Sequence, residues 1–243
     1  MRRGFSVHIG VSSTNGHAGP IGTAVGCDHA AEEMHALATR LGFSTSPLPL
    51  VNGRATHDAV IEAIEDACCK VGDKELLVIT LAGHGRQLAG PGHGNEVHDQ
   101  ALVLYDEYLV DDEMYAALSK VQPTAQVVVV ADGCFMGSIL TLLTLFRGTG
   151  TSTHVRSHAR PPIDADVLLI PATSSTSVAS ALQEGNVPLF TRALLETREG
   201  STSYENLVRR INTFIGDRAP KVTLNTDLLH EGSTLPCQRP FQL

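Results

Sequence analysis

Two short apolar segments of the chain each end at a side chain that could take part in covalent chemistry. The first, E-L-L-V-I-T-L-A-G, is followed by His84 and Gly85, and the second, Q-V-V-V-V-A-D-G, by Cys134. A thiolate is a strong nucleophile, but free cysteine titrates well above neutral pH, so a nucleophilic cysteine needs help to ionise. A neighbouring histidine can accept the thiol proton or stabilise the thiolate as an ion pair. The two residues therefore predict acyl transfer, with Cys134 as nucleophile and His84 as base and then acid.

Both segments have the composition of buried parallel strands, with runs of Val, Ile and Leu that end at glycine. Because open α/β sheets bind ligands at the carboxyl ends of their strands, His84 and Cys134 are expected at one edge of the sheet. Gly85 has no Cβ, so its N–H can approach a developing oxyanion, and the N–H of Cys134 supplies a second donor. A helix expected near residues 138–146 would add the field of its dipole.

Each residue has a simpler interpretation on its own. A single cysteine at a strand end is more often a small buried hydrophobic residue, and a single histidine is more often a hydrogen-bonded polar residue than a base. The conjunction favours catalysis, because two buried strands both end in glycine-flanked reactive residues. About 50 residues separate His84 from Cys134, which is close to the interval in a known class of cysteine peptidases.

The rest of the chain alternates between strand and helix patterns. Further strands are predicted at residues 5–11, 43–51, 101–105 and 167–171, and helices at residues 27–41, 112–121, 189–198 and 203–215, with one more helix that begins at a Thr56 cap. This βαβ rhythm predicts a mostly parallel sheet covered by helices on both faces, which is an α/β fold.

Composition indicates one globular domain over residues 1–243. With 42% hydrophobic residues the chain can bury one sizeable core, and no long linker divides it. The formal net charge of −8 comes without long blocks of charge, which argues against a nucleic acid or a membrane as partner. The five cysteines include an adjacent pair and make a poor disulfide framework, and no signal peptide is recognised, so a cytoplasmic location is expected.

Residues 147–165 differ from the rest of the chain. They are rich in Gly, Ser, Thr, His and Arg, which predicts a flexible loop. A solvated surface loop is the default interpretation, and a linker cut by proteases, including this protein itself, is the alternative. Arg147, Arg156 and Arg160 are then the candidate cleavage sites.

Several motifs together resemble the metacaspases and orthocaspases, within the caspase-like cysteine peptidases that include caspases, legumain and gingipain. L-A-G-H-G at residues 81–85 is similar to the S-G-H-G motif, and A-D-G-C-F-M-G-S at residues 131–138 is similar to D-S-C-H-S-G. Further similarities are those of G-C-D-H-A-A-E-E-M to G-C-x-N-D-A, L-V-D-D-E-M to D-D-E-L, P-L-F-T-R-A-L-L to G-x-F-T-x-A-L, and S-Y-E-N-L to a late helix start. The resemblance therefore extends over nearly the whole chain.

The resemblance implies a caspase-haemoglobinase fold, a three-layer α/β/α sandwich with a mostly parallel central sheet. It also implies peptide hydrolysis by a dyad of Cys134 and His84 through an acyl-enzyme, without a strict third residue. Metacaspases cleave after Arg or Lys because acidic side chains line the pocket for the residue before the scissile bond. Asp132 matches such a position, where a buried carboxylate favours a basic partner, and Cys27 matches the cysteine of the pocket floor.

The sequence departs from the family pattern at two pocket positions. The Asp of N-D-A falls on Ala30 and the Ser of S-G-H-G falls on Ala82, which leaves the preference for a basic residue open. Asp28, two residues before Ala30, is a candidate to compensate as a substrate-binding residue. The alternative is that Asp28 is only a charge at a helix N-terminus.

Calcium is implied as an activator only in part, and the chemistry itself requires no cofactor. Asp111 and Asp112 match paired calcium ligands of the family, with Asp99 or Asp106 as a further oxygen ligand, but an expected acidic position falls on Thr141. The alternative is that Asp111 and Asp112 are a cap and a first-turn charge of the following helix.

Two functions from different classes follow. The first is a cysteine endopeptidase that cuts proteins or peptides after Arg or Lys, as a regulated effector in a stress, cell-death or antiviral response, with a small-molecule or protein activator. The alternative is a catalytically silent caspase homologue that acts as a binding or sensing module. The intact dyad favours the first function, and the changed pocket leaves room for the second.

Overall fold

The computed structural model describes residues 2–19, 21–46, 48–89, 98–134, 162–172, 183–184 and 186–243. Its centre is a seven-stranded sheet in the order β12-β9-β8-β4-β1-β2, with β3 also paired to β1. The strands are β1 (Gly4–Gly10), β2 (Ser44–Thr45), β3 (Leu50–Val51), β4 (Leu76–Ala82), β8 (Gln126–Asp132), β9 (Asp166–Pro171) and β12 (Asn225–Leu228). Among these strands only β12 runs antiparallel to its neighbour, so the predicted mostly parallel sheet is confirmed.

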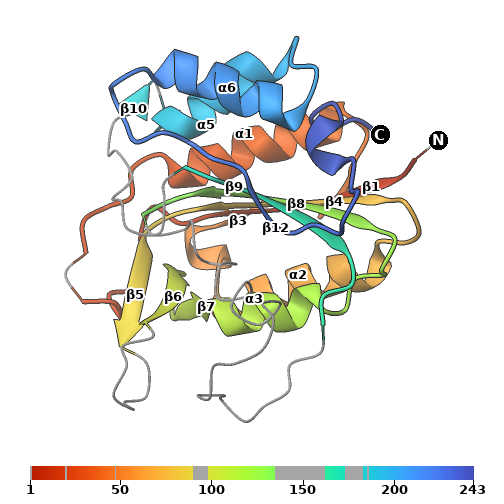
Figure 1. Cartoon of the computed structure of the whole chain (residues 1–243). Helices are drawn as coiled ribbons and strands as arrows, with labels where there is room; N and C mark the ends of the chain where they lie inside the picture. Colours follow the sequence, from red (N-terminus) through yellow and green to blue (C-terminus); the bar gives the residue numbers. More distant parts are fainter. Residues whose placement is uncertain are drawn as a thin grey trace, which may run out of the picture.

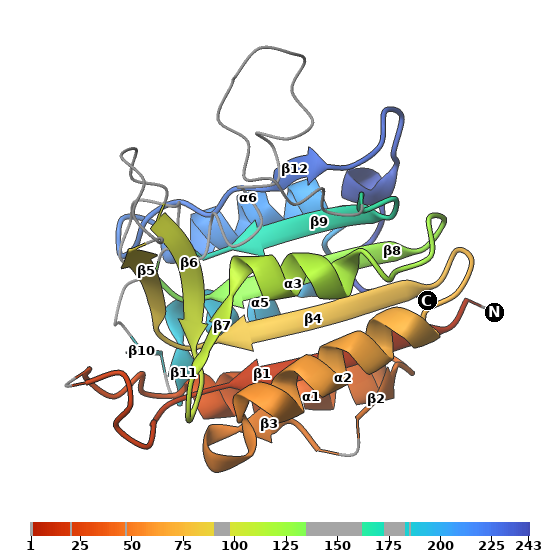
Figure 2. The same cartoon turned by 90° about the horizontal axis from the view of Figure 1, so that it is seen from below.

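Helices cover both faces of this sheet (Figure 1). One face carries α1 (Cys27–Arg40), α5 (Leu189–Arg198) and α6 (Tyr204–Ile215), and the other carries α2 (His57–Lys70) and α3 (Asp111–Leu118), as the view from below shows (Figure 2). Each helix layer packs its apolar side chains on one face of the sheet, which makes two separate hydrophobic cores. Every residue of β4 is buried, which explains its unbroken apolar run. The three-layer α/β/α arrangement predicted from the sequence is confirmed.

The helices begin and end close to the predicted residues, but the predicted capping hydrogen bonds are only partly present. Ser203 caps α6, since its Oγ accepts a hydrogen bond from the N–H of Asn206 at 3.0 Å. Thr56 stands at the N-terminus of α2 but its side chain makes no capping hydrogen bond, so that part of the prediction is wrong. The Oδ1 atom of Asp106 instead accepts the N–H of His57 at 2.9 Å. A carboxylate distant in sequence has replaced the local cap.

Two predicted strands differ from the structure. The segment 43–51 forms only the short strands β2 and β3, each two residues long. The strand predicted at 101–105 does not join the central sheet. Only residues 101–103 of it are in a strand, at the end of β6 (His98–Val103), which pairs antiparallel with β5 (Gly85–Ala89) and with β7 (Tyr108–Val110). Figure 1 shows this second sheet at the edge where the central strands end.

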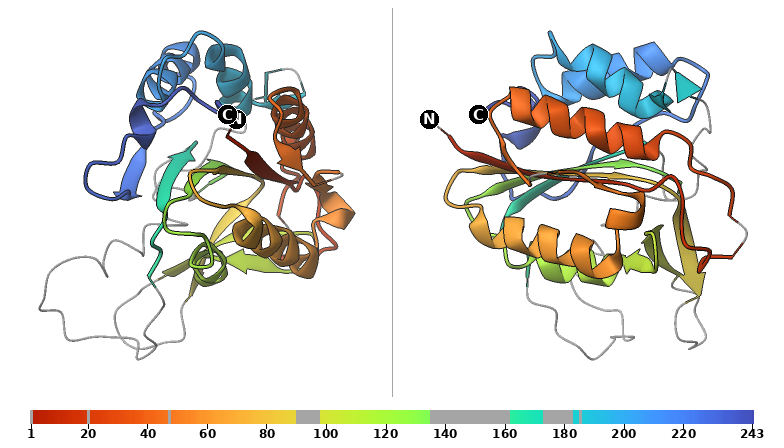
Figure 3. Two further views of the ribbon diagram at one scale, coloured as in Figure 1. Left: turned by 90° about the vertical axis from the view of Figure 1, so that its right-hand side faces the viewer. Right: turned by 180° about the vertical axis from the view of Figure 1, so that it is seen from behind.

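Short elements complete the described fold. A small hairpin of β10 (Gln183–Glu184) and β11 (Val187–Pro188) precedes α5, and two 3-10 helices are η1 (Asn52–Arg54) and η4 (Leu235–Cys237). The two termini lie close together (Figure 3), and Arg2 donates a hydrogen bond to Oε1 of Gln238 at 3.2 Å.

The flexible loop predicted at residues 147–165 extends too far at its carboxyl end. Ile163 and Ala165 are buried in the core on the α2–α3 side, because the chain is already entering β9. Arg147, Arg156 and Arg160 lie outside the described residues, as does the helix expected near 138–146.

Candidate active site

The two reactive residues follow neighbouring strands that end in the same register. Gly10 of β1 pairs with Ala82 of β4, and Ala82 pairs with Asp132 of β8. The ladder continues one residue further, because the N–H of Gly83 donates to the carbonyl oxygen of Asp132 at 3.1 Å. His84 and Cys134 each come two residues after a paired strand end, and both are partly exposed. Since paired strands lie about 4.8 Å apart, His84 and Cys134 follow adjacent strand ends at one edge of the sheet, and their action as a dyad stays a prediction.

A backbone carbonyl orients the imidazole of His84. The Nε2 atom of His84 lies 2.6 Å from the carbonyl oxygen of Gly22, in the loop between β1 and α1. A carbonyl oxygen can only accept a hydrogen bond, so Nε2 carries the proton and the neutral ring keeps its lone pair on Nδ1. Nothing in the sequence indicates this contact, because every residue type has a carbonyl oxygen.

Pairing in the second sheet sets the direction of the N–H group of Gly85. The N–H of Val103 donates to the carbonyl oxygen of His84 at 2.8 Å, and Gly85 pairs with Leu102. In an antiparallel ladder this pattern makes Gly85 and Leu102 a non-hydrogen-bonded pair, so the N–H of Gly85 points away from β6. The ladder thus leaves this donor available, in keeping with the predicted oxyanion site.

Cys27 lies beneath this edge of the sheet as a buried thiol. Its side chain forms a small apolar cluster with Ala30 and Ala82, at exposures of 5%, 2% and 4%. Burial raises the pKa of the Cys27 thiol, and the nearby charges of Asp132 and Asp28 raise it further. Cys27 is therefore a neutral thiol at physiological pH. The two positions at which the sequence departs from the family pattern are thus packed together against it.

Asp132 is buried, with an exposed fraction of 7%, and it accepts hydrogen bonds from the start of α5. Its Oδ2 atom accepts the N–H of Thr191 at 3.1 Å and the hydroxyl of Thr191 at 2.6 Å. Burial raises the pKa of Asp132 to about 6, although these two hydrogen bonds oppose the rise. Thr191 lies in the P-L-F-T-R-A-L-L motif. The motif identified this segment as similar to the family, but it did not predict the contact with Asp132.

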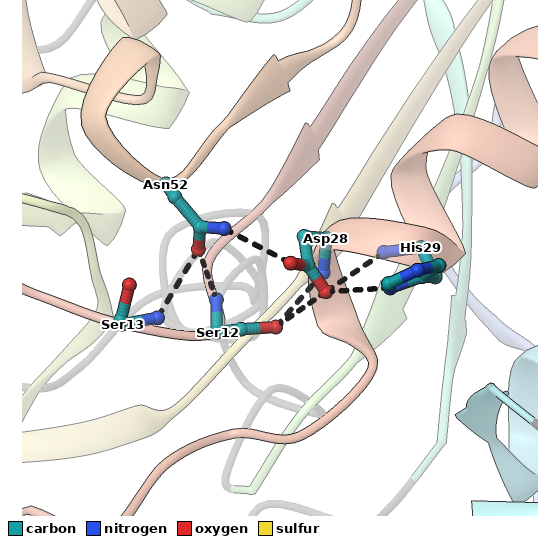
Figure 4. Close-up of polar contacts among 5 residues, drawn as sticks. All are labelled: Ser12, Ser13, Asp28, His29 and Asn52. Carbon is teal, nitrogen blue, oxygen red and sulfur yellow. Dashed lines mark hydrogen bonds and ion pairs between the residues drawn. The ribbon is translucent and has the colours of Figure 1, made fainter.

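Asp28 takes part in a different set of contacts, shown in Figure 4. Its Oδ1 atom accepts hydrogen bonds from the hydroxyl of Ser12 at 2.7 Å and from the N–H of His29 at 2.9 Å, and its Oδ2 atom accepts the amide of Asn52 at 2.9 Å. Partial burial opposes ionisation, but donors on Ser12, Asn52 and His29 hold the pKa of Asp28 at about 2. These contacts favour the helix N-terminal interpretation of Asp28 over a substrate-binding carboxylate.

A cavity of about 240 Å³ adjoins His84 on the side of the loop between β1 and α1. Val103 and eight of the loop residues from Ser12 to Thr23 supply most of its lining, which includes hydroxyl groups and glycine backbone. Among the described residues that line this cavity, His84 is the titratable one.

The predicted calcium ligands are only partly described. Asp111 is the first residue of α3, is 4% exposed, and accepts the N–H of Asp112 on Oδ1 at 3.0 Å. Asp99 belongs to β6, but its side chain lies outside the described residues. Within the described ranges, no group of three or more His, Cys, Asp or Glu side chains is arranged to hold a metal ion. Val110 is the N-cap of α3, so Asp111 and Asp112 are both first-turn charges and neither is the expected cap, and calcium activation stays a prediction.

Comparisons with known proteins bear on the family and the fold. A sequence model of a protein family, the caspase domain, matches residues 17–238. A comparison with curated proteins finds no match. Protein GSU0716 from Geobacter sulfurreducens is similar in structure, with a TM-score of 0.78, 23% identity and 99% of each chain covered. Caspase-1 from Spodoptera frugiperda is also similar, with a TM-score of 0.61, 13% identity, and 93% of this chain and 88% of that chain covered.

At these identities the structural likeness establishes the fold, which is caspase-like. In the described part of the chain, no helix is both long and apolar enough to cross a bilayer. Because the family model matches far more than half of the sequence, this protein belongs to the caspase domain family.

Proposed function

We propose that the protein is a cysteine endopeptidase in which Cys134 and His84 form the catalytic dyad. The observation that carries this proposal is the placement of His84 and Cys134 two residues past paired strand ends, with Nε2 of His84 held by Gly22. Membership in the caspase domain family makes cysteine peptidase chemistry on protein substrates the starting expectation.

The chemistry follows from the atoms at this edge of the sheet. Nδ1 of His84 takes the proton of the Cys134 thiol, and the thiolate attacks the carbonyl carbon of the scissile peptide bond. The N–H groups of Gly85 and Cys134 stabilise the oxyanion. Collapse of the tetrahedral intermediate breaks the C–N bond, and His84 returns its proton to the leaving amine. His84 then activates a water molecule that hydrolyses the thioester and restores the thiol.

The finer assignment is a metacaspase-type enzyme that cleaves after Arg or Lys. Its support is Asp132, a carboxylate two residues before the nucleophile and close to Cys27. A guanidinium or ammonium group beside Asp132 would favour its ionised form. Cytoplasmic location, activation by calcium or by another activator, and a role in stress, cell death or antiviral defence belong to the same proposal.

A catalytically silent homologue that binds or senses a partner is the second candidate. The observation that favours it is the tight packing of Ala30 and Ala82 against Cys27, because two positions that are polar in metacaspases then offer no hydrogen bond to a substrate.

A library of fluorogenic peptides that differ at the residue before the cleaved bond, assayed with and without calcium, separates the candidates. Cleavage after Arg or Lys that disappears in Cys134→Ala would support the peptidase and its specificity. Asp132→Asn then tests the pocket, and loss of the basic preference with retained cleavage of other peptides is expected. No cleavage in any condition, together with a thiol at Cys134 that iodoacetamide alkylates no faster than free cysteine, would contradict the proposed dyad.

A further inference from the structure

The loop between β1 and α1, residues 11–26, decides where the Gly22 carbonyl points. This oxygen is the hydrogen-bond acceptor of His84 Nε2, at 2.6 Å. Most of the loop residues are at least partly exposed, so apolar packing alone does not set its shape. The position of Gly22 must therefore depend on hydrogen bonds elsewhere in the loop.

The start of the loop is bound by the amide group of Asn52. Its Oδ1 atom accepts the N–H of Ser12 at 2.8 Å and the N–H of Ser13 at 3.1 Å, while its Nδ2 atom donates to Oδ2 of Asp28 at 2.9 Å. Figure 4 shows Asn52 facing both the loop and the first turn of α1. One side chain from η1 thus joins the start of the loop to the first turn of α1.

Ser12 and Asp28 close the two ends of the loop on each other. The hydroxyl of Ser12 donates to Oδ1 of Asp28 at 2.7 Å, and the N–H of Asp28 lies 3.1 Å from the same hydroxyl oxygen. The carbonyl oxygen of Ser12 also accepts the N–H of Ala24 at 3.1 Å. A series of hydrogen bonds thus runs from Asn52 through Ser12 to the N–H of Ala24, and Ala24 is only two residues along the chain from Gly22, whose carbonyl orients His84.

The residue type at position 52 suits this arrangement. Asn52 has a φ of 47°, a left-handed conformation that asparagine tolerates better than most residues. Its side chain must accept from Ser12 and Ser13 and donate to Asp28, which requires one oxygen and one nitrogen. Aspartate at this position would keep the acceptor but would place a second carboxylate against Asp28.

We propose that Asn52 and Asp28 are positioning residues, which fix the loop through Ser12 so that the Gly22 carbonyl orients His84 for proton transfer with Cys134. This inference rests on the proposed peptidase function and deepens it. Neither residue touches the reacting atoms, so their effect reaches the chemistry only through the loop.

The test uses the full chain with Asn52→Asp, Asp28→Asn and the double exchange. Asn52→Asp sets two carboxylates against each other, and we expect kcat to fall about tenfold or more with little change in KM. The pH profile of Cys134 alkylation by iodoacetamide should move to higher pH, because the imidazolium that accompanies the thiolate loses its acceptor. The double exchange restores a donor opposite an acceptor and should return kcat to within about threefold of the wild type.

His17→Ala is the matched control, since it removes an exposed side chain of the same loop that lies outside the hydrogen-bond series. Thermal unfolding of each variant identifies any that fail to fold. A folded Asn52→Asp variant with wild-type kcat and a wild-type alkylation profile would overturn the inference, as would a double exchange no better than Asn52→Asp alone. The alkylation profile needs no peptide cleavage, so it tests the positioning even if the peptidase proposal fails, which the Cys134→Ala comparison reveals separately.

Discussion

Asp28 and Asp132 both lie near the Cys27 thiol, but the pKa of the carboxyl group shifts in opposite directions at the two positions. Asp132 is almost fully buried, and within the described ranges both of its hydrogen-bond donors belong to Thr191. The side chain of Asp28 is 23% exposed and receives donors from three residues, Ser12, Asn52 and His29. The pKa of Asp132 is raised to about 6, and that of Asp28 is lowered to about 2.

The contrast shows that burial and donor number together set the charge of a carboxylate at this site. Two donors do not offset full burial at Asp132, whereas several donors and partial solvation more than offset it at Asp28. The two carboxylates share one structural task, because each fixes the first turn of a helix: Asp28 on α1 and Asp132 on α5. The sequence predicted them as two substrate-binding residues, and only Asp132 retains the burial expected of one.

The largest expected effect is on the α1 side, from Gly10→Ala. A Cβ atom at Gly10 would lie 2.1 Å from the carbonyl oxygen of Cys27 and 2.8 Å from Cβ of Ala31. Because the first contact is with backbone, α1 must shift, and we expect a loss of about 3 kcal/mol or more in the free energy of unfolding. Urea denaturation measures it. Gly53→Ala is a control, since its nearest neighbour would lie 3.9 Å away; equal stability of both variants would refute the close packing of α1.

Asp132→Asn tests the carboxylate at the start of α5 through its pH dependence. The folded pKa of about 6 lies above the ordinary aspartate value of 3.8, so the folded state binds the proton more tightly. The contribution of Asp132 to stability is therefore greatest below pH 4 and is lost as the pH rises through 6. Relative to Asp132→Asn, the wild type should lose up to about 3 kcal/mol between pH 4 and pH 7. Unfolding curves at several pH values measure this, and a flat difference would contradict the raised pKa.

Asp28→Asn should give the opposite slope. The folded pKa of about 2 lies below the ordinary aspartate value of 3.8, so Asp28 stabilises the folded state above pH 4, and this contribution is lost as the pH falls toward 2. We expect the wild type to exceed Asp28→Asn by about 2 kcal/mol at pH 7, with a smaller difference at pH 3. Glu205→Gln, at an exposed first-turn position of α6, is the control and should change stability little. A difference that grows at low pH would be inconsistent with this account.

The smallest effect concerns the donors of Asp132. Thr191→Val removes the hydroxyl that donates to Oδ2 at 2.6 Å but keeps the N–H. A loss of about 1.5 kcal/mol is expected, since the hydrogen bond is to an ionisable buried group. Thr197→Val is the matched control on the same helix, where the hydroxyl donates only to the Ala193 carbonyl. An equal decrease in the free energy of unfolding in both variants would mean that the hydrogen bond to Asp132 stabilises the fold no more than one to a backbone carbonyl.

Local patterns predicted the regular elements well, for a physical reason. The apolar runs of β4 and β8 need burial on both faces, and their glycine-flanked ends place His84 and Cys134 at one edge. The ends of α1, α5 and α6 agree with the periodicity of their apolar residues. The hairpin of β5 and β6 was not predicted, because a strand pattern does not specify whether its partner lies in the central sheet or beside it.

The sequence by itself determined the α/β class, the pair of reactive residues and their position after adjacent strands, because hydrophobic periodicity and strand-end chemistry are local properties. Only the tertiary structure decided that Gly22 orients His84, that Thr191 binds Asp132, and that Asn52 joins Ser12 to Asp28. Each of these contacts joins residues at least 24 positions apart in the chain. A backbone carbonyl or a single amide has no sequence signal of its own, and its role depends on which donor or acceptor the fold places opposite it.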